Sequence, residues 1–263
     1  MPYVMRTVLA GRVREVKKMF TGRVHGQGVE PQSREKSESK TKAAQAAVNE
    51  RKAEERLRWK LNANFLPGDY HIVLHYYDKA VTLEQAEADK KLFLRNLRKE
   101  YKKREIPWKY VACTETKRMT NVHHHIIIAA SDVGLIQSVW EKTLGERQGN
   151  VSLKPLDKRG NHGKLANYLM KETRSTVKRA RAAGMRYKRF ACSQGLIQPE
   201  PEYTVIQANG WNREPRARKG WLLLKDDNGD ICRNGWHELT GWGWQEYFEI
   251  WTGADAPPRR KRQ

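Results

Sequence analysis

Three consecutive histidines, His123, His124 and His125, run directly into three isoleucines and are the residues of this sequence best suited to chemistry. The β-branched run predicts a buried strand. Because side chains alternate along a strand, His123 and His125 share one face and His124 points to the other. Two imidazoles about 6–7 Å apart on one face can bind one metal ion. The alternative is a core strand whose histidines are hydrogen-bonded within the protein.

A carboxylate is expected beside this pair. Glu115 lies eight residues before His123 and follows a strand-like run over 110–113. If the two strands form an antiparallel hairpin through the loop 117–121, Glu115 comes next to His123. Two histidines and one carboxylate on one side of an ion leave its other positions open to water and substrate. Glu115, His123 and His125 are therefore a candidate metal site.

A candidate nucleophile lies in the segment 161–172, which predicts a helix. Lys164, Tyr168 and Lys171 fall on one face of it. A phenol has a pKa of about 10 and attacks poorly at pH 7 unless a cation lies close. Lys171 is placed to favour the phenolate or to hold a phosphate. The alternative is an ordinary amphipathic helix with the Tyr168 ring in the core.

Charge indicates the substrate. The 263 residues carry a formal net charge of +21, which favours a polyanion and most simply a nucleic acid. The segment 171–190 has eight Lys or Arg and a single acid, Glu172, which is typical of a nucleic-acid surface; the alternative is a merely soluble basic segment. The expected DNA-binding residues are Lys164, Arg174, Lys178, Arg179, Arg181, Lys188 and Arg189.

Several protein classes are excluded by what the sequence lacks. No apolar run approaches the roughly 18–20 residues that span a bilayer, and no signal peptide is visible, so we expect no membrane partner and a cytoplasmic location, in the cytosol of a bacterial host. The three cysteines lie far apart and predict neither a zinc ribbon nor a disulfide framework. No Gly-X4-Gly-Lys-Ser/Thr loop is present, so no ATP-driven helicase is expected within this sequence.

The elements expected around these residues form an α+β fold. Hydrophobic periodicity and turn signals predict strands at 70–77, 108–115, 122–130 and 150–155, and helices at 33–61, 82–106, after Asp132 and at 161–172. Further strands are expected at 203–207, 221–224 and 247–251, with Asn228-Gly229 turning the second of them into a hairpin with 230–231.

Four parts follow from this reading: a basic N-terminal arm and helix at 1–64, a catalytic domain at 65–200, a β-rich and Trp-rich extension at 201–256, and a basic disordered tail at 257–263. His71 and His75 share one face of the strand at 70–77. They either approach a metal or phosphate on a neighbouring strand or are half-buried polar residues, and we favour the second.

The order of strand, Glu115, His-X-His strand and then a helix with Tyr168-X-X-Lys171 resembles the HUH endonucleases. Within them it looks most like the phage- and plasmid-type replication-associated proteins with a single catalytic tyrosine. The resemblance spans roughly residues 45 to 200 of this sequence. Further similar segments are 49–51, 64–69, 70–77, 193–196 and 199–200.

The resemblance implies a central antiparallel sheet with helices packed on it. It implies that Glu115, His123 and His125 bind Mg²⁺ or Mn²⁺, that Tyr168 is the nucleophile and that Lys171 assists it. The implied reaction is nicking of single-stranded DNA at a replication origin, which leaves a 5′-phosphotyrosine and a free 3′-hydroxyl. This would initiate rolling-circle replication of a phage, plasmid or related mobile element, with a host helicase and polymerase as possible partners.

Two residues depart from the family pattern. His124 stands where a bulky apolar residue is usual, so a second register of the histidine motif is conceivable. His75 stands where the first motif usually has a threonine. The alternatives are a related HUH transposase or mobilisation relaxase, and a non-enzymatic basic nucleic-acid-binding protein whose histidines are structural.

Overall fold

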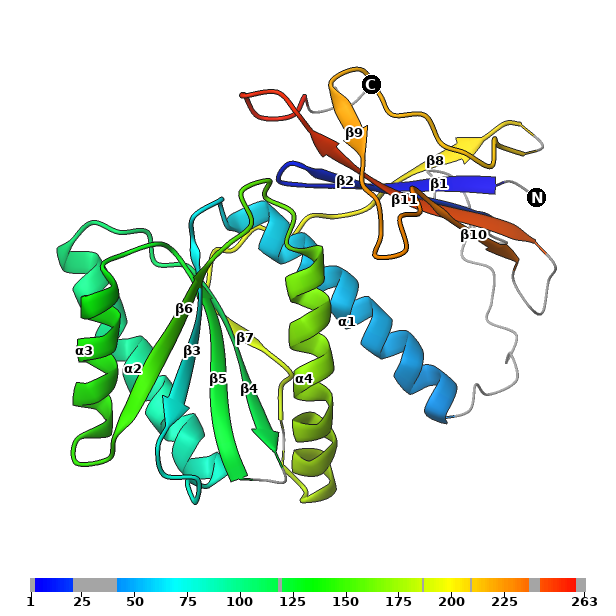
Figure 1. Cartoon of the computed structure of the whole chain (residues 1–263). Coiled ribbons are helices and arrows are strands. Elements are labelled where there is room, and N and C mark those ends of the chain that lie inside the picture. The colour runs from blue at the N-terminus through cyan, green and yellow to red at the C-terminus, as the bar shows by residue number, and fades with distance from the viewer. Residues whose placement is uncertain are drawn as a thin grey trace. The chain divides into compact units, whose positions relative to one another are not determined.

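The computed structural model describes residues 3–20, 42–117, 120–185, 187–208, 210–236 and 242–258. The chain divides into two compact units, one made of residues 1–63 and 198–263 and the other of residues 64–197. In the part of the chain that is described, the fold is α+β, with two antiparallel sheets and four helices (Figure 1). The expected fold class is confirmed, and the architecture is compatible with an HUH-like fold.

The unit at 64–197 is built on a five-stranded sheet in the order β6-β3-β5-β4-β7, in which each pair of neighbours is antiparallel. Its strands are β3 (Tyr70–Tyr76), β4 (Tyr110–Lys117), β5 (Thr120–Ile128), β6 (Gly149–Pro155) and β7 (Ala191–Cys192). Its helices are α2 (Leu83–Lys103), α3 (Val133–Leu144) and α4 (Gly163–Ala182).

One face of this sheet forms the main hydrophobic core with α2 and α3. Alternate residues of the central strands, including Ile72 and Ile126, are buried there against Phe93 and Trp140. The period of two along each strand sends the intervening residues to the opposite face. Because the apolar residues of β3 and β5 fix which face is buried, they also fix which side chains remain for the other face.

The helix α4 packs on β4. Its hydrophobic stripe includes Ala166 and Leu169, and it is tied to β4 by the Thr116 amide, which donates to Thr176 Oγ1 at 2.8 Å. The helix runs to Ala182, ten residues past the expected end at 172, because buried positions continue at helical spacing through Ala180. Part of the expected basic segment is therefore helical.

The unit of residues 1–63 and 198–263 contains a second sheet, in the order β10-β11-β2-β1-β8, with β9 paired to β11. Trp59 of α1 packs on its Val8 and Ala10. The elements are β1 (Tyr3–Ala10), β2 (Val13–Phe20), α1 (Lys42–Asn64), β8 (Glu202–Ile206), β9 (Trp221–Leu223), β10 (Arg233–Trp236) and β11 (Gly243–Trp251).

The expected N-terminal arm is replaced by a β-hairpin. Strands β1 and β2 pair along their length, and Gly11, with φ of +57°, makes the turn between them. A side chain there is excluded, since a Cβ on Gly11 would lie 1.9 Å from the Asn62 carbonyl oxygen. The hairpin is stabilised because β1 pairs with β8 and β2 pairs with β11, about 200 residues away in the sequence. No local pattern in residues 1–32 reveals these pairings.

The strands of the C-terminal segment pair differently from the hairpin that the sequence predicts. Gly229, with φ of +89°, makes the expected turn and donates its amide to the Asp226 carbonyl. However, β9 and β10 pair with β11 and not with each other, so the expected hairpin at 221–231 is wrong. Of the expected tail at 257–263, residues 259–263 lie outside the described residues. No helix in the described ranges is long and apolar enough to cross a membrane.

Stability near α4 is expected to depend on pH through His162. This residue precedes the helix, is buried, and has Nε2 3.1 Å from the Phe65 carbonyl oxygen, to which Nε2–H donates. Burial lowers the pKa of His162 below its ordinary value of 6.5. The unfolded chain then binds the proton more readily, so the stability that neutral His162 contributes is lost as the pH falls below 6.5.

The variant His162→Gln keeps a donor near Phe65 but does not titrate. We expect it to lose less free energy of unfolding than the unchanged protein between pH 7 and pH 5, as measured by urea unfolding at each pH. Parallel pH profiles for the two proteins would show that His162 does not contribute.

Candidate active site

The expected metal residues lie on the face of the sheet opposite the α2 and α3 core. Strand β5 lies between β3 and β4, and His123 is paired with Glu115 of β4 on one side and with His75 of β3 on the other. His125, one pleat along, is paired with Cys113 of β4. Alternation therefore brings these side chains to one face, as the spacing predicts.

Glu115 and His125 are in direct contact. Glu115 Oε2 lies 3.1 Å from His125 Nε2, and the two residues are only 6% and 3% exposed. The hydrogen bond from His125 lowers the pKa of the Glu115 carboxyl, against the opposing effect of burial. A carboxylate oxygen and an imidazole nitrogen are both ligands that Mg²⁺ or Mn²⁺ accepts, so the donor atoms of this pair would suit such an ion.

His123 shares the face of that pair but is set apart from it. Its ring packs against His75, with the ring centroids 4.7 Å apart. The ligand atoms of Glu115, His123 and His125 do not all lie within 4.8 Å of one another, judged over the residues that the structure describes. The structure thus joins two of the three expected ligands and places the third beside them on the same strand face.

His124 points into the opposite core and is fully buried. Its Nδ1 lies 2.9 Å from Thr114 Oγ1 and its Nε2 lies 3.1 Å from the Tyr76 hydroxyl. Burial lowers the pKa of His124 well below 6.5, so the ring is neutral at pH 7. Thr114 in turn donates to Glu87 of α2 at 2.7 Å. The histidine at the usual apolar position is therefore a satisfied core residue, and the second register has no support in this fold.

His71 and His75 are half-buried, as favoured from the sequence, but they also lie against the candidate metal residues. His71 Nε2 is 3.2 Å from His125 Nδ1, and His75 Nε2 is 3.0 Å from Ser152 Oγ. Burial and the neighbouring His125 lower the pKa of His71 to about 4, which leaves its ring neutral at pH 7. Pairing of β3 with β5 creates the contact of His71 with His125, and pairing of β3 with β6 creates the contact of His75 with Ser152. A local sequence pattern reveals neither pairing.

Tyr168 lies on α4 with its ring directed at the histidines. Its ring centroid is 5.6 Å from that of His125 and 6.4 Å from that of His71, and the residue is 41% exposed. The alternative of a core tyrosine is therefore not what the structure shows. Burial and the charges of Glu115 and Glu172 raise the pKa of the Tyr168 phenol, so a cation would have to offset those carboxylates before the phenol could attack readily.

Glu172 is a member of the site that was not predicted from the sequence. It lies four residues after Tyr168 on α4, and its carboxyl is hydrogen-bonded to that of Glu115. Burial and the Glu115 charge raise the pKa of Glu172. A local signal was present, since positions i and i+4 of a helix share a face and Glu172 is the single acid in the basic segment 171–190.

The expected DNA-binding residues fall into two groups. Arg179 is half-buried and donates from Nη2 to the Thr116 carbonyl oxygen at 2.8 Å, so it helps to hold α4 on β4; Arg189 is also half-buried. The others are exposed, and so is Lys171. The exposed basic residues of α4 are Lys164, Lys171, Arg174, Lys178 and Arg181, and Lys188 follows the helix.

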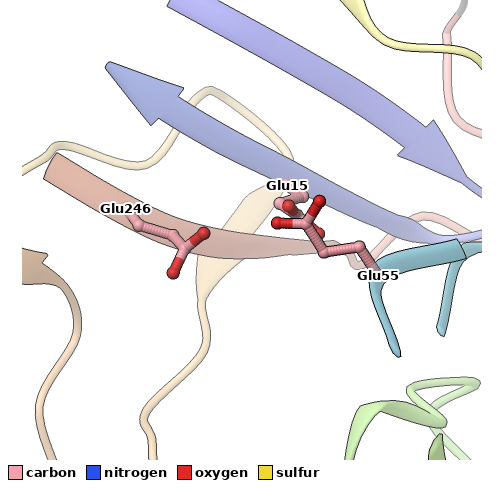
Figure 2. A group of neighbouring side chains, drawn as sticks. All are labelled: Glu15, Glu55 and Glu246. Carbon is pink, nitrogen blue, oxygen red and sulfur yellow. The ribbon is translucent and has the colours of Figure 1, made fainter. Parts of the chain in front are cut away.

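A separate acidic cluster lies in the other unit. Glu15, Glu55 and Glu246, from β2, α1 and β11, have carboxylate oxygens within 4.8 Å of one another (Figure 2). It is the one group of three ligand-type residues this close together among the residues that are described. Its oxygens, however, are already paired with cations of the chain.

Arg6 links two of these carboxylates. Its guanidinium donates to Glu15 Oε1 at 2.7 Å and to both oxygens of Glu55 at 3.1 Å, while Lys17 Nζ lies 3.6 Å from Glu246. Charge pairing within the protein accounts for the proximity of the carboxylates. We therefore assign this cluster as an ion-pair network that joins α1 to the sheet.

Comparison with known proteins gives a match to a family of replication proteins. Residues 69–175 match the family Replication-associated protein ORF2/G2P. The match covers less than half of the chain but contains β3, β4, β5 and the start of α4, and hence Glu115, the three histidines and Tyr168. It supports a replication-associated protein and suggests a role in the initiation of replication. No curated protein and no solved structure matches.

Proposed function

We propose that this protein is a metal-dependent endonuclease that nicks single-stranded DNA through Tyr168 and so initiates rolling-circle replication. The observation that carries the proposal is the convergence of a helical tyrosine with the Glu115 and His125 pair on one face of the sheet. The match to a replication-associated family over this same segment supports it. The partner is single-stranded DNA at an origin.

The residues that would hold the ion are Glu115 and His125, with His123 on the same face. Glu172, in contact with Glu115, is a further carboxylate within reach of the site. Oxygen and imidazole ligands suit Mg²⁺ or Mn²⁺. When bound, the ion would supply positive charge to the non-bridging oxygens of the scissile phosphate.

The chemical step then rests on Tyr168. Its phenolic oxygen forms a bond to phosphorus while the bond from phosphorus to the 3′-oxygen breaks, which leaves a 5′-phosphotyrosine and, after uptake of one proton, a 3′-hydroxyl. Glu172, one helical turn along α4, is close enough for its charge to raise the pKa of the Tyr168 phenol, and in its ionised form it is the proposed acceptor of the phenolic proton. Lys171 is exposed on the same helix, where it can contact the DNA phosphates near the reacting bond.

The test uses the full chain and single-stranded DNA of the element's own origin, labelled separately at the 5′ and 3′ ends. With Mn²⁺ we expect a covalent protein–DNA band after denaturation that carries the 3′ label, together with a shortened 5′-labelled strand. A chelator should abolish both products. Salt-sensitive binding with no covalent band would instead establish a nucleic-acid-binding protein. Transfer to a second strand, without priming of synthesis, would favour the transposase or relaxase alternative.

The exposed basic residues of α4 give a prediction about DNA affinity. Lys178 and Arg181 lie one turn apart and are both exposed. If each contacts a phosphate, the variant Lys178→Ala/Arg181→Ala reduces the slope of log affinity against log salt by about 1.4, from about 0.7 for each contact with a single strand. Fluorescence anisotropy with a labelled oligonucleotide measures the slope.

The matched control is Lys99→Ala/Lys142→Ala, which removes two exposed lysines from α2 and α3, on the opposite side of the sheet. It should leave the slope unchanged. An equal decrease in both double variants would mean that general charge, and not a DNA path along α4, determines the affinity.

A further inference from the structure

The His125 ring is bonded at both of its nitrogens by residues from the two neighbouring strands. Its Nε2 lies 3.1 Å from Glu115 Oε2 of β4, and its Nδ1 lies 3.2 Å from His71 Nε2 of β3. His125 is 3% exposed, so both contacts are made away from bulk water. The ring is thus held in one orientation, with Nε2 towards the carboxylate.

A neutral imidazole offers one lone pair to an ion and keeps its proton on the other nitrogen. Since Nε2 faces Glu115, His125 would offer its Nε2 lone pair to an ion held jointly with that carboxylate, and its proton would then sit on Nδ1. A buried N–H needs an acceptor. Metal-bound histidines generally donate this second N–H to a carboxylate, carbonyl or water, which fixes the tautomer; here the group in that place is the imidazole of His71.

We propose that His71 is a positioning residue that holds His125 in its metal-binding tautomer. This inference rests on the proposed function, and it concerns a residue that acts through His125. In the ion-free site, His125 Nε2–H donates to Glu115 and His71 Nε2–H donates to His125 Nδ1. With an ion bound, His125 Nδ1–H would donate to His71 Nε2, and the His71 proton would sit on its own Nδ1. Each ring keeps one proton in both states.

The local geometry supports this role for His71 and not for His75. The rings of His71 and His125 are inclined by only 26°, with centroids 5.4 Å apart, in a diagonal contact across β3 and β5. His75, on the same face of β3, has Nε2 directed at Ser152 of β6. The two histidines of one strand therefore have different partners.

Three variants of His71 distinguish the effect of its hydrogen bond to His125 from the effect of the volume that its ring fills. His71→Gln carries a polar atom at about the position of the imidazole Nε2, whereas His71→Asn carries the same amide at about the position of Nδ1, too short to reach His125. His71→Leu fills the space without any polar atom. A purely structural role for His71 predicts that Gln and Asn behave alike.

The readouts are binding measurements on the full chain without DNA. Titration with Mn²⁺, followed by electron paramagnetic resonance of the free ion, gives the affinity. Nuclear magnetic resonance of ¹⁵N-labelled imidazoles, with and without Mg²⁺, gives the tautomer of His125. We expect His71→Leu and His71→Asn to weaken Mn²⁺ binding by about 10- to 100-fold and to lose the single Nδ1–H tautomer, while His71→Gln retains both.

The measurements distinguish failure of the proposed function from failure of the role proposed for His71. If the unchanged protein binds neither Mn²⁺ nor Mg²⁺ at His125, the proposed function fails at its metal site. If it binds the ion through His125 Nε2 and all three variants do the same with equal affinity, the metal site stands and the role of His71 is overturned. Equal weakening by Gln and Asn would also overturn it.

Discussion

Replacing Tyr168 by phenylalanine is expected to abolish the covalent protein–DNA product and to lower the rate of strand cleavage by at least about 10⁴-fold, the scale seen when a nucleophile is removed. The change deletes one oxygen atom and leaves the ring, which lies 5.6 Å from that of His125. Because Tyr168 is 41% exposed, loss of the hydroxyl leaves no buried donor unpaired, so the fold should persist.

Tyr77→Phe is the matched control. Tyr77 lies just after β3 in the same unit, is 61% exposed and is not part of the site. It should give the same covalent yield as the unchanged protein in the labelled-origin assay. A covalent band that survives in Tyr168→Phe would move the nucleophile to another residue and end the assignment of Tyr168.

Replacing Glu115 by glutamine is expected to have the second largest effect. The amide keeps the size of the carboxylate and can still hydrogen-bond His125, but it removes the negative charge that an ion at the 3.1 Å pair would need. We expect Mn²⁺ affinity to fall by at least about tenfold and metal-dependent cleavage to fall by about 10²- to 10³-fold, as suits the loss of roughly 3–4 kcal/mol of charge stabilisation.

The Mn²⁺ affinity and the rate of cleavage should both be measured, because together they distinguish a role of Glu115 in ion binding from a role in the reaction. A fall in the cleavage rate that saturating Mn²⁺ restores places Glu115 in ion binding, whereas a fall in the cleavage rate that persists at saturating Mn²⁺ places it in the reaction itself. Glu141→Gln, on the exposed face of α3, is the control and should change neither. An unchanged Mn²⁺ affinity in Glu115→Gln would remove Glu115 from the metal site.

The core of the candidate site could be predicted because its signals are local. Alternation along β5 separates His123 and His125 from His124, and the β4 and β5 hairpin brings Glu115 to His123 by short-range pairing. The helix that presents Tyr168 was equally visible, since its buried residues recur at helical spacing. The matched family segment covers this same local block.

What could not be predicted depends on contacts between distant segments. The bond between His71 and His125 requires β3 to pair with β5, and the bond between Glu115 and Glu172 requires α4 to pack on the open face of the sheet. The N-terminal hairpin was missed for the same reason, because β1 and β2 are completed by β8 and β11. Periodicity describes one element at a time and does not specify its partner.

The pairing of β1 and β2 with the C-terminal strands also sets an order of events during synthesis. Residues 64–197 are continuous and make one unit, whereas the other unit is interrupted by them. The inner unit can fold as soon as it leaves the ribosome, but the outer edges of β1 and β2 stay without partners until residues 202–206 and 243–251 have been made. The unit that bears Glu115, His125 and Tyr168 can thus fold before the other sheet, whose strands come from both sides of it in the sequence, is complete.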